Sequence, residues 1–185
     1  IIYDIIFIYF KEISLIKNDL QIVDSIYNYA LKINKYDYKE TLLSLTFALV
    51  PYKKVPIQIP FTKIILNYPL ISSEDSIFYL KNKNLPKYLF LDSPKNEFGD
   101  KDKLAHFFGN AFLSYSTIFF ELTNFIGYFV EVFEENFKVD SKIDYRDLYV
   151  NNLGKIFARK LKVNKNILPS EILILYNIQF IFINP

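Results

Sequence analysis

The spacing of apolar positions along the chain predicts a mainly helical protein. In residues 18–34, apolar side chains recur at the spacing of one helical face, behind a start signal formed by Asn18 and Asp19. A second helix is expected over residues 39–50, because Pro51 cannot continue it. Together with three later helical stretches, this pattern predicts the fold class: a mainly α helical bundle with a Pro-rich extended connecting segment.

Prolines interrupt the pattern between residues 51 and 70. In "VPIQIPF", residues 55–61, apolar positions alternate with Pro and Gln, which favours an edge strand or an extended surface segment over a central strand. The residues from 163 onward turn apolar again, and their pattern fits a strand or a helix. We therefore expect four segments: an N-terminal helical segment 1–50, a Pro-rich connecting segment 51–98, a three-helix core with a polar pocket 99–162, and an apolar C-terminal segment 163–185.

Each helix expected in the core carries a polar stripe. The first begins at Lys101, with Asp100 as its predicted cap, and the others cover residues 122–138 and 144–161. The stripes contain the single histidine of the chain and several acids and amides. Their members are Asp102, Lys103, His106, Gly109, Asn110 and Thr117 in the first helix, Asn124, Gly127, Glu131, Glu134 and Glu135 in the second, and Asp144, Asp147, Asn151 and Gly154 in the third.

One glycine in every stripe argues that the stripes face one another. In an exposed helix, glycine costs about 1 kcal/mol relative to alanine, whereas between close helix backbones it makes room. We therefore expect His106, Glu131, Asp147 and Asn151 to share a partly buried pocket, in which Asp102 could hold a ring nitrogen of His106. The alternative is that each stripe is the solvated face of an ordinary amphipathic helix.

Composition narrows the chemistry. Without cysteine and with one histidine, the chain can form neither a thiolate site nor a multi-histidine metal site, and we expect no cofactor and no metal. The net charge of +2 is spread along the sequence, which argues against nucleic acid as a partner. The absence of methionine indicates residues upstream of Ile1.

Two features leave a membrane contact open. The basic stretch "KIFARKLKVNK", residues 155–165, fits a helix C-terminus or anionic lipid headgroups, and we favour the helix end. The central charge-free run, residues 107–120, is shorter than the roughly 18 apolar residues of a spanning helix. Two short membrane-embedded or interfacial helices meeting near Glu121 remain a further interpretation.

The three stripes also resemble a known pattern. "DKDKLAHFFGNAFLSY", "GYFVEVFEE" and "DYRDLYVNNLG" are similar to the Asp-Lys-x-x-His-Phe helix, the Glu-bearing helix and the Asp-x-x-x-Asn-x-x-Gly helix of YfiM-like lipoproteins, and more distantly to membrane-embedded VanZ-like proteins. The resemblance covers residues 99–158. It implies a helical protein of the bacterial cell envelope, periplasmic or membrane-associated. The matching polar residues are Asp102, Lys103, His106, Glu131, Asp147, Asn151 and Gly154.

Three functions compete at this point. The first is a non-catalytic envelope protein whose polar cluster is structural or binds an amphiphilic ligand, since the sequence has no nucleophile elbow and no phosphate loop. The alternative is a hydrolase or transferase acting on lipid or cell-wall precursors, with His106 as acid/base and Glu131 as its carboxylate partner. In that hypothesis Asp147 and Asn151 position the substrate or a divalent ion. The third is a peripheral module that docks on anionic membrane through residues 155–165. The sequence leaves open which protein partner, if any, the chain binds.

Overall fold

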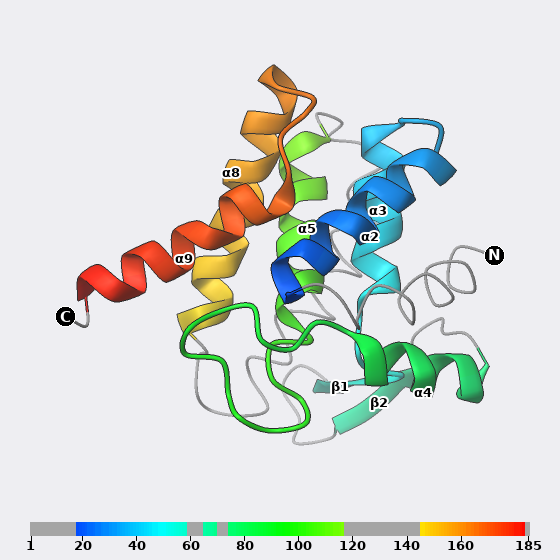
Figure 1. Cartoon of the computed structure of the whole chain (residues 1–185). Helices are drawn as coiled ribbons and strands as arrows, with labels where there is room; N and C mark the ends of the chain where they lie inside the picture. Colours follow the sequence, from blue (N-terminus) through cyan, green and yellow to red (C-terminus); the bar gives the residue numbers. More distant parts are fainter. Residues whose placement is uncertain (1–17, 59–64, 70–73, 117–144, 184–185) are drawn as a thin grey trace. The chain divides into compact units, whose positions relative to one another are not determined.

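The computed structural model describes residues 18–58, 65–69, 74–116 and 145–183, which are mainly helical (Figure 1). The predicted fold class is confirmed. The elements of the described residues are α2 (Asp19–Ile33), α3 (Tyr38–Ala48), β1 (Lys54–Gln58), β2 (Ile65–Pro69), α4 (Asp75–Asn84), α5 (Lys103–Tyr115), α8 (Tyr145–Val163) and α9 (Pro169–Ile183).

The chain divides into two compact units. The first comprises residues 1–51, 73–116 and 147–185, and it holds all the described helices apart from the first two residues of α8. The second comprises residues 52–72 and 117–146, and its described part contains the two strands. The polar stripes of α5 and α8 therefore belong to a single unit.

The first two helices begin where polar caps place them. Asn18 accepts a hydrogen bond from the backbone N–H of Gln21 at 2.9 Å, and the Gln21 side chain accepts from the Asn18 N–H at 3.3 Å, which forms a capping box. Asp37 caps α3 through the N–H of Glu40 at 3.0 Å. The predicted start of the first helix is confirmed, and α3 ends at Ala48, two residues before the predicted end at Val50.

The Pro-rich segment contains regular structure. Strand β1 pairs with β2 in antiparallel register, with Pro56 opposite Asn67, so the strand interpretation of "VPIQIPF" holds for its described residues 55–58. Helix α4 follows and was not predicted. Its apolar residues, 77–80, are consecutive and do not recur at helical spacing, and Lys81 is its only buried residue.

Aromatic rings form the centre of the helical unit. Tyr27 of α2, Phe107 and Phe108 of α5, and Phe157 of α8 are fully buried. The ring centroids of Tyr27 and Phe157 lie 5.6 Å apart, and those of Phe107 and Phe157 lie 5.3 Å apart. Since burial of one such side chain stabilises a fold by about 1.5–3 kcal/mol, this group is a main source of cohesion between α2, α5 and α8.

The end of the chain is helical. Helix α9 resolves the ambiguity of the apolar C-terminal segment, and it packs against α2 (Figure 1). The basic stretch 155–165 lies at the C-terminal end of α8, with Lys160 and Lys162 in its last turn, as the helix-end interpretation predicts. Among the described residues, no helix has both the length and the apolar character needed to cross a membrane. The expected helix 122–138 and the residues around Glu121 lie outside the described residues.

Candidate functional site

The loop that leads into α5 differs from the prediction. Helix α5 begins at Lys103, with Asp102 at the N-cap position, so the expected start at Lys101 with Asp100 as cap is wrong. The Asp100 carboxylate instead accepts hydrogen bonds from the Leu89 N–H at 3.1 Å and from the Ser93 hydroxyl. Asp100 thereby orders the preceding loop, which fixes the first turn of α5.

Gly154 lets α8 approach α5 closely. A Cβ atom at this position would lie 2.2 Å from the Phe107 carbonyl oxygen and 3.1 Å from the Asn110 Cβ. No side chain larger than hydrogen fits there unless the two helices move apart. The sequence argument from glycine therefore gives the correct physical reason for this residue, and the contact sets the distance across which polar side chains of the two helices meet.

Lys103 joins two carboxylates at this contact. Its Nζ lies 2.6 Å from Asp147 Oδ1 and 3.3 Å from Asp102 Oδ2, and all three side chains are largely buried. The Asp147 contact is an ion pair rather than a well-directed hydrogen bond, because Oδ1 accepts no hydrogen bond within the described residues. One ammonium group thus offsets negative charge at the N-terminal ends of both α5 and α8.

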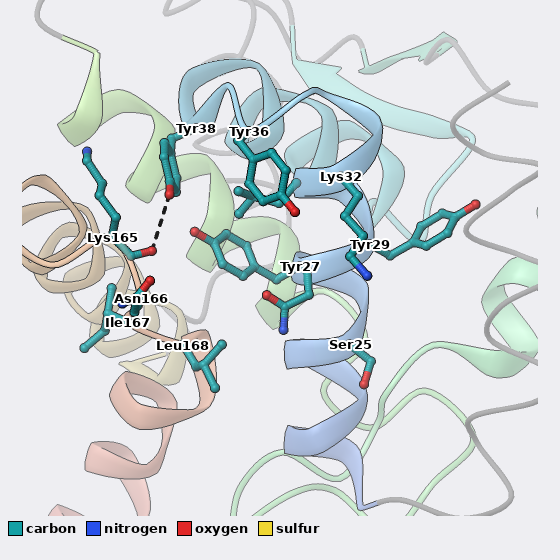
Figure 2. Close-up of a pocket in the computed structure, with 12 residues that line it drawn as sticks. Ser25, Tyr27, Tyr29, Lys32, Tyr36, Tyr38, Lys165, Asn166, Ile167 and Leu168 are labelled. Atoms are coloured by element: carbon teal, nitrogen blue, oxygen red, sulfur yellow. Dashed lines mark hydrogen bonds between the residues drawn. The ribbon is translucent and has the colours of Figure 1, made fainter.

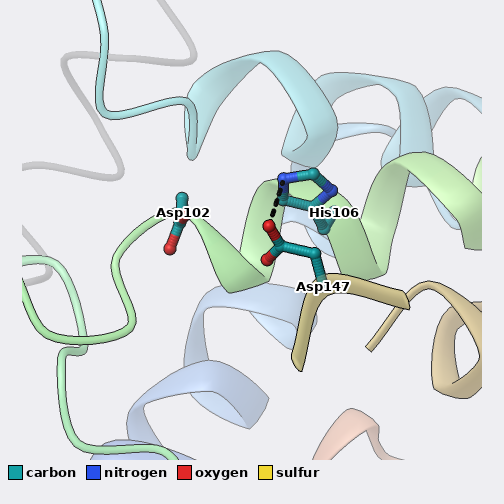
Figure 3. Close-up of side chains that lie close together, drawn as sticks. All are labelled: Asp102, His106 and Asp147. Atoms are coloured by element: carbon teal, nitrogen blue, oxygen red, sulfur yellow. Dashed lines mark ion pairs between the residues drawn. The ribbon is translucent and has the colours of Figure 1, made fainter. Parts of the chain in front are cut away.

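His106 is held from both sides of its ring. Its Nδ1 lies 3.2 Å from Asn151 Oδ1, which also accepts a hydrogen bond from Asn110 Nδ2 at 2.8 Å. A carbonyl oxygen only accepts, so this orientation of Asn151 makes Nδ1 the protonated nitrogen. Nε2 faces Asp147 Oδ2 at 3.8 Å, an ion-pair distance rather than a hydrogen bond (Figure 3). Among the described residues, Asn151 and Asp147 flank the ring, whereas we expected Asp102 in that role.

Asp102 occupies a less favourable environment. Burial raises the pKa of its carboxyl, and the neighbouring Asp147 raises it further, while Lys103 and His106 act in the opposite direction. Its Oδ1 is buried and has no hydrogen-bond partner among the described residues. The carboxylate therefore depends on the ammonium of Lys103 for its stability.

The spacing of three ligand-type side chains invites comparison with a cation site. One ligand atom each from Asp102, His106 and Asp147 lie within 4.8 Å of one another. The Lys103 ammonium already contacts both carboxylates, so it supplies the positive charge that an ion would bring. We therefore interpret this group as a cluster in which the Lys103 ammonium occupies the place of a cation between the two carboxylates.

The structure brings together most of the predicted site residues. We use "polar cluster" for Asp102, Lys103, His106, Asn110, Asp147 and Asn151, with Gly154 at the helix contact beside them. Gly127 and Glu131 lie outside the described residues. Gly109 is buried in α5, so its stripe is not a solvated face.

Sequence reasoning missed two other polar features. Lys81 is buried in α4, and a pocket with tyrosine walls lies between the α2–α3 turn and the α8–α9 loop. With 19 Phe and 15 Tyr in the chain, no single ring stands out in the sequence. No protein-family model matches the chain, and no match was found among curated proteins or solved structures. Function must therefore be argued from the geometry.

Proposed function

We propose that this chain is a helical protein of the bacterial cell envelope, of the type that the YfiM-like lipoproteins represent, and that its polar cluster has a structural and non-catalytic role. The cluster would fix α5 against α8 and so hold the aromatic core in one arrangement. In this account the envelope assignment is supported by the three-part sequence pattern, and the structural role by the contacts of the cluster.

The observation that carries the structural role is the double contact of Lys103. A buried carboxylate or ammonium group is tolerated when it is paired, and removal of one partner leaves an uncompensated charge. Lys103 touches an acid at the start of its own helix and an acid on α8. Correct packing of α5 on α8 is therefore the arrangement in which each of the two buried carboxylates has the Lys103 ammonium as a partner.

The position of His106 favours this role over the hydrolase or transferase alternative. A general acid or base needs a ring nitrogen that reaches substrate. In His106, Nδ1 faces Asn151 and Nε2 faces Asp147, and the side chain is buried. Both nitrogens thus already face protein oxygens that orient the ring.

Replacement of His106 by Ala tests the structural role. We expect a loss of about 2 kcal/mol in the free energy of unfolding, because Asn151 and Asp147 lose their shared partner in a buried site. Urea titration followed by circular dichroism measures it. Asn152→Ala, an exposed position beside Asn151, is the control and should change stability by less than about 0.5 kcal/mol. A His106→Ala protein as stable as the parent would contradict the proposal.

Association with the membrane surface forms the second part of the proposal. Helix α9 carries one acidic residue, Glu171, and exposes much of its apolar surface, while basic residues at the end of α8 are also exposed. Exposed apolar side chains on a helix and exposed basic residues in the same unit are features that favour the interface of an anionic bilayer. The exposed apolar residues of α9 are Ile174, Leu175, Ile178, Ile181, Phe182 and Ile183.

Sedimentation with vesicles tests this part. The protein should pellet with phosphatidylglycerol vesicles, less so with phosphatidylcholine vesicles, and less at high salt. Ile178→Glu in α9 should reduce pelleting strongly, whereas Leu148→Glu in α8, a position of similar exposure, should have little effect. Equal pelleting of the two variants, or none by the parent protein, would contradict membrane association and leave the structural role to its own test.

A further inference from the structure

A second site lies apart from the polar cluster. Residues of the α2–α3 region and of the α8–α9 loop enclose a pocket of about 470 Å³ (Figure 2). This volume is in the range of small-molecule sites. Four tyrosines and two asparagines contribute to its lining, and no member of the polar cluster does.

Tyr27 brings unused hydrogen-bonding capacity to the wall of this pocket. Its side chain is 2% exposed, and its hydroxyl has no hydrogen-bond partner among the described residues. Figure 2 shows this hydroxyl directed toward the side of the pocket that Lys165 and Asn166 form. Tyr38 donates to the Lys165 carbonyl oxygen at 3.5 Å, which is a long contact. Buried polar groups are normally satisfied, so an unused hydroxyl in a pocket wall points to a ligand atom that pairs with it.

Tyr36, which also lines the pocket, has an unfavourable backbone conformation. It follows α2 with a φ of +63°, and the preceding Lys35 has a φ of +52°. Glycine or asparagine normally takes this left-handed conformation after a helix. Tyr36 nevertheless presents a ring that is 62% exposed and lines the pocket. Strained positions of this kind gather at ligand sites, and a bulky ring here has no burial to offset the strain.

The charges around the pocket disfavour a cationic ligand. No carboxylate is found among the described lining residues, and Lys32 is exposed. The Lys165 ammonium lies over the Tyr38 ring at 4.8 Å and bonds to the Tyr115 hydroxyl at 2.8 Å, with its side chain directed away from Tyr27 (Figure 2). A cation beside Tyr27 would lose water without gaining an opposite charge, which is unfavourable. An anion beside Tyr27 would lie on the side of the pocket away from the Lys165 ammonium, which already contacts Tyr38 and Tyr115.

We propose that this pocket binds a small neutral polyhydroxylated molecule, such as a monosaccharide or the terminal sugar of a glycan. Tyrosine rings offer flat apolar faces for the C–H groups of a sugar ring, and Tyr27, Asn28 and Asn166 offer groups that donate and accept hydrogen bonds. Burial raises the pKa of the Tyr27 phenol, so its hydroxyl keeps its proton and can both donate and accept, as a sugar hydroxyl does. This proposal is independent of the proposed structural role, because no residue of the polar cluster lines the pocket.

Saturation-transfer NMR with methyl β-D-glucopyranoside and N-acetyl-D-glucosamine tests the proposal. Irradiation of the tyrosine ring protons should transfer magnetisation to the sugar C–H protons of at least one of the two probes. Tyr36→Ala should weaken binding about fivefold or more, whereas Tyr79→Ala on α4, which is 68% exposed and outside the described lining, should leave it unchanged. Absence of transfer to both sugars, or equal loss in the two variants, would overturn the proposal.

Tyr27→Phe separates binding from folding. The variant loses only a hydroxyl without a described partner, so its melting temperature should equal or exceed that of the parent, while sugar binding falls about fivefold. A lower melting temperature with unchanged binding would assign Tyr27 to the fold alone and overturn the proposal. Phenyl phosphate serves as the charged probe, and tighter binding of phenyl phosphate than of phenyl β-D-glucopyranoside would overturn the neutral class of ligand.

Discussion

Two lysines are buried in the described part of the helical unit, and their surroundings differ. Lys103 on α5 lies between the carboxylates of Asp102 and Asp147. Lys81 on α4 donates to the Val50 carbonyl oxygen at 2.5 Å and has the Phe78 ring at 4.6 Å, with no carboxylate partner among the described residues. The Lys103 charge is compensated by opposite charges, and the Lys81 charge only by a dipole and a ring.

The difference shows in the cost of each charge. Burial lowers the pKa of Lys81 to about 8, because desolvation penalises its ammonium form. Beside Lys103, the cost of burying charge is seen at Asp102, because burial raises the pKa of the Asp102 carboxyl. The cost of burying Lys81 on α4 can thus be relieved by loss of its proton. Lys103, in contrast, belongs to a charge network that joins two helices.

Removal of the Lys103 ammonium should have the largest effect. Lys103→Met keeps most of the side-chain volume but leaves Asp102 and Asp147 as neighbouring buried carboxylates, so we expect a loss of about 3–5 kcal/mol in the free energy of unfolding. Chemical denaturation at pH 7 measures it. Lys155→Met on the exposed face of α8 is the matched control, and equal effects at the two positions would contradict the compensated-charge account.

The next largest loss of stability is expected from a side chain at Gly154, where α5 and α8 are in close contact. Gly154→Ala places a methyl group against the Phe107 carbonyl oxygen, and we expect a loss of about 2 kcal/mol despite the better helix propensity of alanine. Thermal unfolding of the variant and of Arg159→Ala, an exposed residue of the same helix, measures the difference. A Gly154→Ala protein more stable than the parent would mean that α5 and α8 are not in close contact.

The Lys81 contrast predicts a pH dependence of defined sign. Between about pH 8 and 10.5, the folded protein binds fewer protons at Lys81 than the unfolded chain, so the free energy of unfolding rises with pH. Below pH 8 both states hold the proton, and the full cost of burial remains. The advantage of Lys81→Met over the parent should therefore be about 3 kcal/mol larger at pH 7 than above pH 10.5. Urea titrations of both proteins across this range test it, and a constant difference would contradict it.

At Asp102 we expect a smaller effect of opposite sign: its contribution to the free energy of unfolding rises as the pH falls. Its raised pKa means that the folded state binds more protons than the unfolded chain as the pH falls, so acidification relieves a cost at this residue. Asp102→Asn should be more stable than the parent at pH 7, by less than about 1 kcal/mol, and this advantage should vanish below the ordinary carboxyl value of 3.8. Loss of stability at pH 7 would show that the Lys103 contact outweighs burial.

The sequence predicted the helices where caps and apolar spacing agree. Asn18 and the periodic positions of α2 identify one helix, and Pro51 limits α3. Helix α4 was not predicted because its apolar residues, 77–80, are consecutive and show no helical periodicity. Its only buried residue is Lys81. The predicted start of α5 is two residues too early, because the carboxylate of Asp100 binds the loop at Leu89 and Ser93 and does not cap the helix.

The candidate site was partly predictable for a similar reason. Helical spacing and the glycine argument indicate which side chains of α5 and α8 face one another, but spacing does not give distances. It could not show that Lys103 rather than Asp102 is central, or that Asn151 rather than an acid contacts His106 Nδ1. The tyrosine pocket depends on a left-handed turn at Tyr36 and on the path of the α8–α9 loop, neither of which leaves a pattern in the sequence.

The most direct measurement of the central claim is a double-mutant cycle between Lys103 and Asp147. Lys103→Met, Asp147→Leu and the double variant are compared with the parent by urea unfolding. Because the two side chains meet at 2.6 Å in a buried contact, we predict a coupling of about 2 kcal/mol or more, with the double variant more stable than the Lys103→Met single variant. Effects that add to within about 0.5 kcal/mol would show that the pair does not join α5 to α8.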